Sequence, residues 1–269
     1  MGITLCRKCK VESLLFGVIV KFLALMRRVI TCLVSIFAIL CILNCSVEKL
    51  TQNAKINPGQ ECVVLVHGYL RSSNHLSHLR NFLIQKGFYV VSIDYPSTTL
   101  NIQEIVGSYF SSQILDHCQN QTIHFVTHSL GGVIVRYYLK TNQIKNLGRV
   151  LMLAPPNQGS EIADFLSQFN LLNSFLGPIL VQIKTDNSSF VHSLGLPKFE
   201  FAIISGDYTL DPISSFIIPG IDDGRVSISN TNLENRKDFL LVKRSHNFIM
   251  DAPEVQEAIF TYIKFGRFK

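Results

Sequence analysis

Short, mainly apolar runs, of which residues 62–66 are unbroken, alternate with longer, helix-spaced apolar stretches from about residue 61 onward. The runs of strand length are residues 62–66, 88–93, 122–127, 150–153, 199–204 and 239–242. Helix-spaced stretches lie at residues 76–84, 102–118, from 133 onward and 252–265. Unbroken apolar strands are typical of a parallel sheet that is covered on both faces. The pattern therefore predicts an α/β fold in which helices flank a mainly parallel sheet.

The strand–helix alternation stops between residues 160 and 196. An apolar series at or near helical spacing replaces it, and it includes Phe165, Phe169 and Phe175. We expect a small helical cap at about residues 160–198, whose apolar face meets an acyl chain or a lipid surface. The alternative interpretation is that these helices simply face the core.

The first 45 residues read as a targeting segment, followed by a polar linker at residues 46–60. Residues 29–43 are apolar and uncharged, and Met26, Arg27 and Arg28 precede them. A basic start before a short apolar run is typical of a secretory signal, and the run is short for a membrane span. Translation from Met26 would give a compact signal peptide, in which Cys45 ends a lipobox-like run. Alternatively, the segment is an uncleaved anchor that keeps Met1 or Met26, a pair of membrane-associated helices, or a buried helical extension.

Charge and cysteine content support this division of the chain. The net charge is +6, but residues 46–269 hold 19 basic and 18 acidic residues and so carry only +1. The folded part therefore has no electrostatic surface suited to nucleic acid. Five of the seven cysteines lie in the first 45 residues, and we expect Cys62 and Cys118 to be buried thiols. We predict an exported, membrane-associated protein.

The stretch around Ser129 predicts a nucleophile. An apolar strand ends at His128, Ser129 follows, and a helix-compatible run begins after Gly131 and Gly132. A tight turn between strand and helix holds a serine in strained geometry and exposes its hydroxyl. Small residues must flank the serine, because strand and helix nearly touch there. Thr127 stands where the usual G-x-S-x-G pattern has glycine.

A serine hydroxyl needs a base and a carboxylate that orients the base. Of the eight histidines, His246 follows the last predicted strand, which is the position of the base in α/β-hydrolases. Asp223, Asp207 and Asp211 are the candidate acids. No metal-ligand spacing appears, and we expect neither a metal nor a cofactor.

From about residue 61 the chain resembles an α/β-hydrolase of the lipase/esterase type, similar to bacterial triacylglycerol lipases and lipase-like relatives. Five pieces in the correct order carry the resemblance: Val-His-Gly-Tyr (66–69), Thr-His-Ser-Leu-Gly-Gly (127–132), Ala-Pro-Pro-Asn-Gln-Gly-Ser (154–160), Asp-Asp-Gly-Arg-Val (222–226) and Ser-His-Asn-Phe (245–248). It implies an α/β-hydrolase domain over residues 61–269. The family's acid lies in an Asp-Gly-x-Val segment, which favours Asp223. It also implies an oxyanion hole made by the backbone N–H groups of Tyr69 and Leu130.

These features together predict a serine hydrolase that cleaves carboxylic esters, with lipid or small acyl esters as substrates. The alternative is a non-catalytic or acyl-transferring member that binds lipid. A broken triad would favour the binding version, and the sequence carries all three residues.

Overall fold

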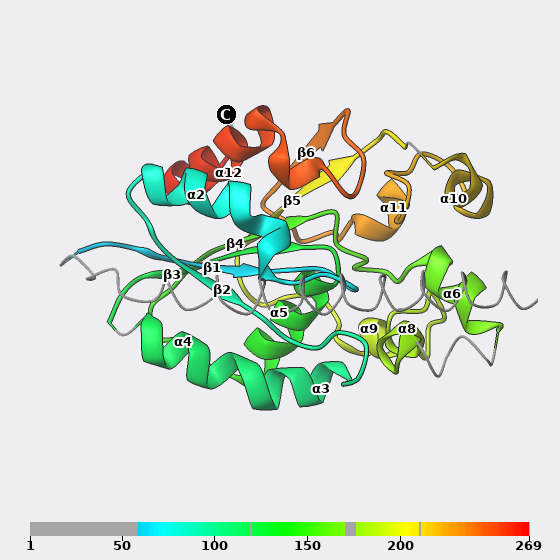
Figure 1. Cartoon of the computed structure of the whole chain (residues 1–269), viewed down its shortest axis with the longest axis horizontal. Coiled ribbons are helices and arrows are strands. Elements are labelled where there is room, and N and C mark those ends of the chain that lie inside the picture. Colours follow the sequence, from blue (N-terminus) through cyan, green and yellow to red (C-terminus); the bar gives the residue numbers. More distant parts are fainter. Residues whose placement is uncertain (1–58, 119, 170–175, 210, 269) are drawn as a thin grey trace, which may run out of the picture. The chain divides into compact units, whose positions relative to one another are not determined.

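A six-stranded parallel sheet forms the centre of the computed structural model, which describes residues 59–118, 120–169, 176–209 and 211–268 (Figure 1). The strands are β1 (Cys62–Val66), β2 (Tyr89–Ile93), β3 (Ile123–His128), β4 (Leu147–Leu153), β5 (Phe201–Gly206) and β6 (Asp238–Val242). Their order is β2-β1-β3-β4-β5-β6, and every pair is parallel. The predicted fold class is confirmed. Because parallel strands end at the same edge, the loops after β1, β3, β5 and β6 meet there.

Helices cover both faces of the sheet, as the unbroken apolar strands predicted. Figure 1 shows α2 (Ser77–Gln85) and α12 (Pro253–Phe265) on one face. The other face carries α3 (Ile102–Ile105), the π-helical turn η3 (Val106–Phe110), α4 (Ser111–His117) and α5 (Leu130–Thr141). Alternate residues of β1 serve the two layers, since Val63 and Leu65 join one buried cluster while Val64 and Val66 join the other.

The described part of residues 160–198, where the sequence predicts a cap, contains the short helices α6 (Glu161–Ser167), α8 (Ile179–Gln182) and α9 (Phe190–Ser193). Ile179 and Leu180 are buried, whereas Phe165 and Phe169 are 38% and 46% exposed. The apolar series therefore divides into a core-facing part and an outward-facing part. Phe175 lies outside the described residues.

The described residues hold four further short helices in the connections. The turns η2 (Ser73–Leu76) and η4 (Ile249–Asp251) are 3-10 helices. Helices α10 (Pro212–Ile217) and α11 (Ile228–Thr231) flank the Asp222–Asp223 segment. Side-chain caps explain both starts, because Asp211 accepts from the N–H groups of Ile213 and Ser214, and Ser227 accepts from that of Asn230.

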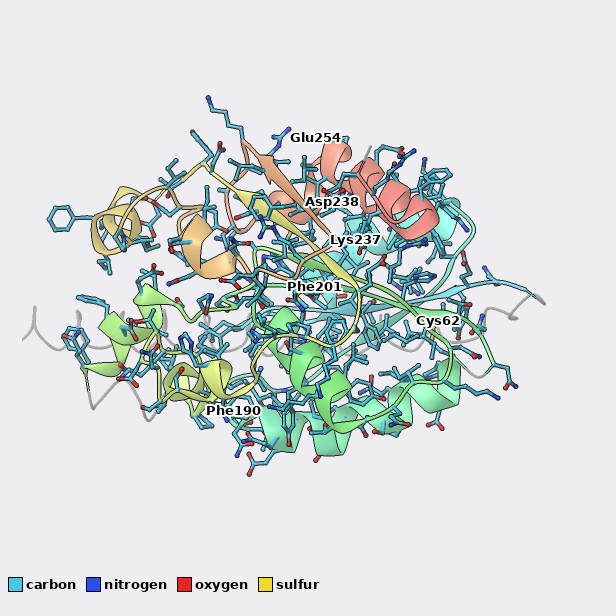
Figure 2. All side chains as sticks on the ribbon, turned by 180° about the vertical axis from the view of Figure 1, so that it is seen from behind. Cys62, Phe190, Phe201, Lys237, Asp238 and Glu254 are labelled. Carbon is cyan, nitrogen blue, oxygen red and sulfur yellow. A yellow bond between two sulfur atoms is a disulfide. The ribbon has the colours of Figure 1, made fainter. Side chains whose placement is uncertain are left out.

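Cys62 and Cys118 form a disulfide, so the expectation of two free thiols was wrong. Cys62 begins β1 and Cys118 caps the end of α4, and both are buried. Figure 2 labels Cys62 together with Phe201 and Asp238, which begin β5 and β6. Because these are first residues of parallel strands, the disulfide lies at the edge of the sheet opposite the loops after β1, β3, β5 and β6.

Within the described ranges, no helix is both long and apolar enough to cross a bilayer. The predicted targeting segment at residues 1–45 and most of the linker lie outside the described residues. The interpretation of that segment therefore stays a prediction.

Candidate active site

Ser129 occupies the sharp turn between β3 and α5 that the sequence predicted. Its backbone has φ 53° and ψ −123°, which is strained for a residue with a side chain. A Cβ atom on Gly131 would lie 2.4 Å from the Val66 carbonyl oxygen, so only glycine fits there. Thr127 is tolerated two residues before the serine because its side chain is buried and its hydroxyl donates to the Leu151 carbonyl at 3.4 Å. The strained turn places Ser129 between β3 and α5, and the missing side chain at residue 131 lets the start of α5 approach the end of β1.

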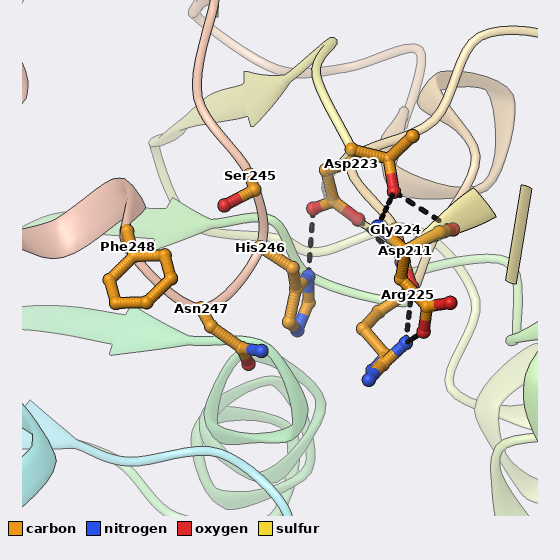
Figure 3. Close-up of a pocket in the computed structure, with 9 residues that line it drawn as sticks. Asp211, Asp223, Gly224, Arg225, Ser245, His246, Asn247 and Phe248 are labelled. Atoms are coloured by element: carbon orange, nitrogen blue, oxygen red, sulfur yellow. Dashed lines mark hydrogen bonds and ion pairs between the residues drawn. The ribbon is translucent and has the colours of Figure 1, made fainter.

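The His246 imidazole links Ser129 to Asp223. The His246 Nε2 lies 2.9 Å from the Ser129 Oγ, and its Nδ1 lies 2.7 Å from the Asp223 Oδ2. Both His246 and Asp223 are buried, and Figure 3 shows the carboxylate aimed at the ring. The Asp223 backbone carbonyl also accepts from the His246 N–H at 2.8 Å, which fixes the two loops together. The structure thus brings together all three residues that the sequence nominated.

Neither rival carboxylate contacts His246 in the described part of the chain. Asp207 follows β5 and is exposed. Asp211 caps α10 and accepts from the Arg225 Nη1 at 2.8 Å. The Arg225 guanidinium holds the pKa of the Asp211 carboxyl far below its usual value. Asp211 therefore stabilises its own loop and does not orient the histidine, and Asp223 is the acid that the geometry favours.

The loop after β1 passes directly over the serine. A Cβ atom on Gly68 would lie 3.1 Å from the Ser129 Cβ, so the loop is in contact with the nucleophile. Tyr69 follows Gly68, and Leu130 is the first residue of α5, where backbone N–H groups have no partner within the helix. These placements suit the two predicted oxyanion donors. The Tyr69 hydroxyl donates to the Leu176 carbonyl at the cap, and burial raises the pKa of Tyr69 to about 12.

Two buried histidines support this arrangement and were not singled out for a role from the sequence. The His67 Nδ1 bonds the Gly68 carbonyl at 2.8 Å, and its Nε2 lies 3.2 Å from the Asp94 Oδ1, which lowers the Asp94 pKa. The His128 Nε2 donates to the His246 carbonyl at 2.9 Å. Burial, and secondarily the nearby His246, lower the pKa of His128 well below its usual value, so it is neutral. In the sequence, the signals that could have identified these two histidines are their positions directly before Gly68 and Ser129.

Comparison with known proteins adds a family model and several solved structures. The model, described as palmitoyl protein thioesterase, matches residues 62–194. The mature Bacillus licheniformis lipase BlEst2 is similar with a TM-score of 0.58 and 20% identity, over 73% of this chain and 89% of that one. The Exiguobacterium antarcticum esterase EaEST gives 0.54 and 14%, over 77% and 93%. No curated protein matches.

Phospholipase PlaB from Legionella pneumophila is also similar, with a TM-score of 0.53 and 22% identity. The match covers 64% of this chain and 44% of PlaB, so this chain spans less than half of that protein. The six parallel strands, the helices on both faces and these likenesses agree with one another. The chain therefore has the α/β-hydrolase fold, which it shares with these lipases and esterases.

Proposed function

We propose that this protein is a serine hydrolase that cleaves carboxylic esters, with lipid or other acyl esters as its substrates, through a covalent acyl-enzyme. The observation that carries the proposal is the continuous hydrogen-bond chain from Ser129 through His246 to the buried Asp223. A serine that is held in a strained turn and bonded to an oriented imidazole is an activated nucleophile.

The reaction proceeds in two halves. Ser129 Oγ attacks the ester carbonyl carbon while its proton passes to His246 Nε2, and the buried Asp223 carboxylate stabilises the imidazolium. The N–H groups of Tyr69 and Leu130 bind the oxyanion of the tetrahedral intermediate. His246 then gives its proton to the leaving alcohol, and the acyl group stays on the serine. Water, deprotonated by His246, attacks the acyl-enzyme; the bond between the acyl carbon and Ser129 Oγ then breaks, His246 returns the proton to Oγ, and the acid is released.

Thioesters are a second substrate class, because the matching family model is that of palmitoyl protein thioesterase. The thioester carbonyl would react at the same serine, and its thiolate leaving group depends less on protonation by His246. A purely binding role has no comparable support, since the hydrogen-bond chain of the three residues is complete. Acyl transfer would use the same three residues with an alcohol in place of water as the acceptor.

A panel of p-nitrophenyl esters and matched acyl thioesters of several chain lengths tests the proposal. Ser129→Ala should lower kcat by about 10³-fold or more, as loss of a triad nucleophile does. The variant should keep its melting temperature, because Ser129 sits at a partly exposed turn. Hydrolysis of every substrate by Ser129→Ala at the wild-type rate would show that the assignment is wrong.

We also propose that the protein acts outside the cytoplasm and on a membrane. The basic and apolar pattern of residues 1–45 supports export. The Cys62–Cys118 disulfide supports it independently, because disulfides persist in oxidising compartments. Intact-mass measurement of the membrane fraction separates a lipoprotein that begins at Cys45 from an anchor that retains Met1 or Met26. Recovery of the full-length chain from the cytosol would contradict both forms.

A further inference from the structure

A small pocket opens beside the base of the proposed triad. Its lining includes Asp223 and His246 together with Thr209, Arg225, Ser245 and Asn247, and Phe248 is its one large apolar residue. Figure 3 shows the Arg225 guanidinium and the Asn247 carboxamide on opposite sides of the His246 ring. The pocket therefore adjoins the imidazole that handles the proton, and two side chains that can donate hydrogen bonds flank that ring.

The position of the pocket fixes which part of a substrate would enter it, if the proposed function holds. His246 Nε2 must reach the oxygen of the departing alcohol, because that oxygen takes the proton when the ester bond breaks. The alcohol portion therefore lies on the side of His246. Its surroundings differ from the apolar cap, where Phe165 and Phe169 are partly exposed. The leaving group should accordingly meet Arg225 and Asn247 as well as the Phe248 ring.

The charge at this rim is positive. The charges of Arg225 and Asp211 neutralise one another in an ion pair at 2.8 Å, and the Asp223 carboxylate is hydrogen-bonded to His246. A second guanidinium reaches the rim from the loop after β1, where Arg71 Nη2 donates to Asn247 Oδ1 at 3.1 Å. In the described ranges Arg71 forms no ion pair with a carboxylate, and its side chain is exposed. One uncompensated guanidinium thus lies where the leaving group would emerge.

We propose that Arg71, with Asn247 and Arg225, forms a subsite for a phosphate-bearing alcohol, so that the preferred substrates are acyl esters with an anionic phosphate headgroup. Guanidinium groups match phosphate oxygens in geometry and form charge-assisted hydrogen bonds with them. The donors come from three separate loops, after β1, before α11 and after β6, and so approach from different directions. A tetrahedral phosphate accepts bonds from several directions, which a planar carboxylate does less well.

A matched pair of substrates tests this subsite in the full chain, namely octanoyl glycerol and octanoyl glycerol phosphate. The wild type should have the higher kcat/KM on the phosphorylated ester. In Arg71→Gln the ratio of the two kcat/KM values should fall by about tenfold or more, because a charge-assisted hydrogen bond is lost. Arg71→Lys should keep part of the preference. Glycerol phosphate should inhibit the wild type competitively and Arg71→Gln correspondingly less.

Lys145→Gln is the matched control. It removes one positive charge from the loop before β4, at the edge of the sheet opposite the site. An equal fall of the ratio in Lys145→Gln would mean that net charge alone steers the substrate, and an unchanged ratio in Arg71→Gln would remove Arg71 from the subsite. Either result overturns the inference while ester hydrolysis stands. Failure of the wild type to cleave either ester, or any member of the p-nitrophenyl and thioester panel, would instead contradict the proposed function.

Discussion

Replacing Asp223 with asparagine should nearly abolish turnover, for a reason that the hydrogen bonds of this carboxylate make specific. Asp223 Oδ1 accepts from the backbone N–H groups of Arg225 at 3.0 Å and Val226 at 2.9 Å, while Oδ2 faces His246 Nδ1 at 2.7 Å. In Asp223→Asn the side-chain oxygen must stay on the two N–H donors, because an NH2 group there would oppose them. The NH2 group therefore faces His246 Nδ1.

The consequence is that His246 takes the opposite tautomer. An NH2 group only donates, so His246 Nδ1 must accept and the ring proton moves to Nε2, which faces Ser129 Oγ at 2.9 Å. A protonated Nε2 cannot take the serine proton. In a serine protease the same exchange lowers kcat by about 10⁴-fold, and we expect a loss of that order here. At about 1.4 kcal/mol per factor of ten, the barrier rises by about 5.5 kcal/mol.

The assay is hydrolysis of a soluble p-nitrophenyl ester at saturating substrate, with the melting temperature as a check of folding. Asp207→Asn and Asp211→Asn are the matched controls, because they make the same substitution at carboxylates that do not contact His246. Both control variants should retain most of the wild-type kcat. A larger loss in Asp207→Asn than in Asp223→Asn would refute the assignment of the acid and the tautomer argument with it.

Three further outcomes follow from burial and long-range contacts. Replacing Cys62 and Cys118 together with alanine should lower the free energy of unfolding by about 4 kcal/mol, as expected for a crosslink between residues 56 apart; kcat should persist, and an unchanged urea midpoint would argue against the disulfide. Because burial depresses the pKa of His128, its neutral form stabilises the fold above pH 6.5 or so, and this stability is lost as the pH falls below that value. Urea titrations between neutral and mildly acidic pH should show that His128→Asn removes about 1.4 kcal/mol per pH unit from the acid-side slope, whereas an identical slope would mean that His128 protonates in the folded state. Introducing aspartate at both Phe165 and Phe169 should reduce hydrolysis of emulsified long-chain esters more than that of soluble short ones; equal losses would mark these rings as part of the core.

The strands and the strained serine could be predicted because their signals are local. A run of five apolar residues such as Cys62–Val66 indicates a buried strand without reference to any other part of the chain. A glycine such as Gly131 indicates that another backbone segment passes close to it. Contacts between distant residues gave no such signal. The disulfide joins residues 56 apart, the His128–His246 bond joins residues 118 apart, and the Arg71–Asn247 bond joins residues 176 apart.

Such pairs depend on which loops and helix ends the folded chain places side by side, and a single sequence does not encode that arrangement at any one position. The choice among Asp207, Asp211 and Asp223 rested on resemblance for the same reason. The cap shows a different limit. Helical spacing indicated an apolar face in residues 160–198, but only packing shows that Ile179 faces inward while Phe169 faces outward.

The strands begin at one edge of the sheet and the proposed catalytic loops lie at the opposite edge, which matters for immobilising the protein. The described chain enters the sheet at Cys62, at the edge where the strands begin, whereas Ser129 and His246 follow the ends of β3 and β6. A support, affinity handle or reporter domain joined directly to residue 59, in place of residues 1–58, is therefore attached on the side away from the nucleophile. One joined into the loops after β1 or β6 would stand at the substrate entrance and compete with the molecules to be cleaved.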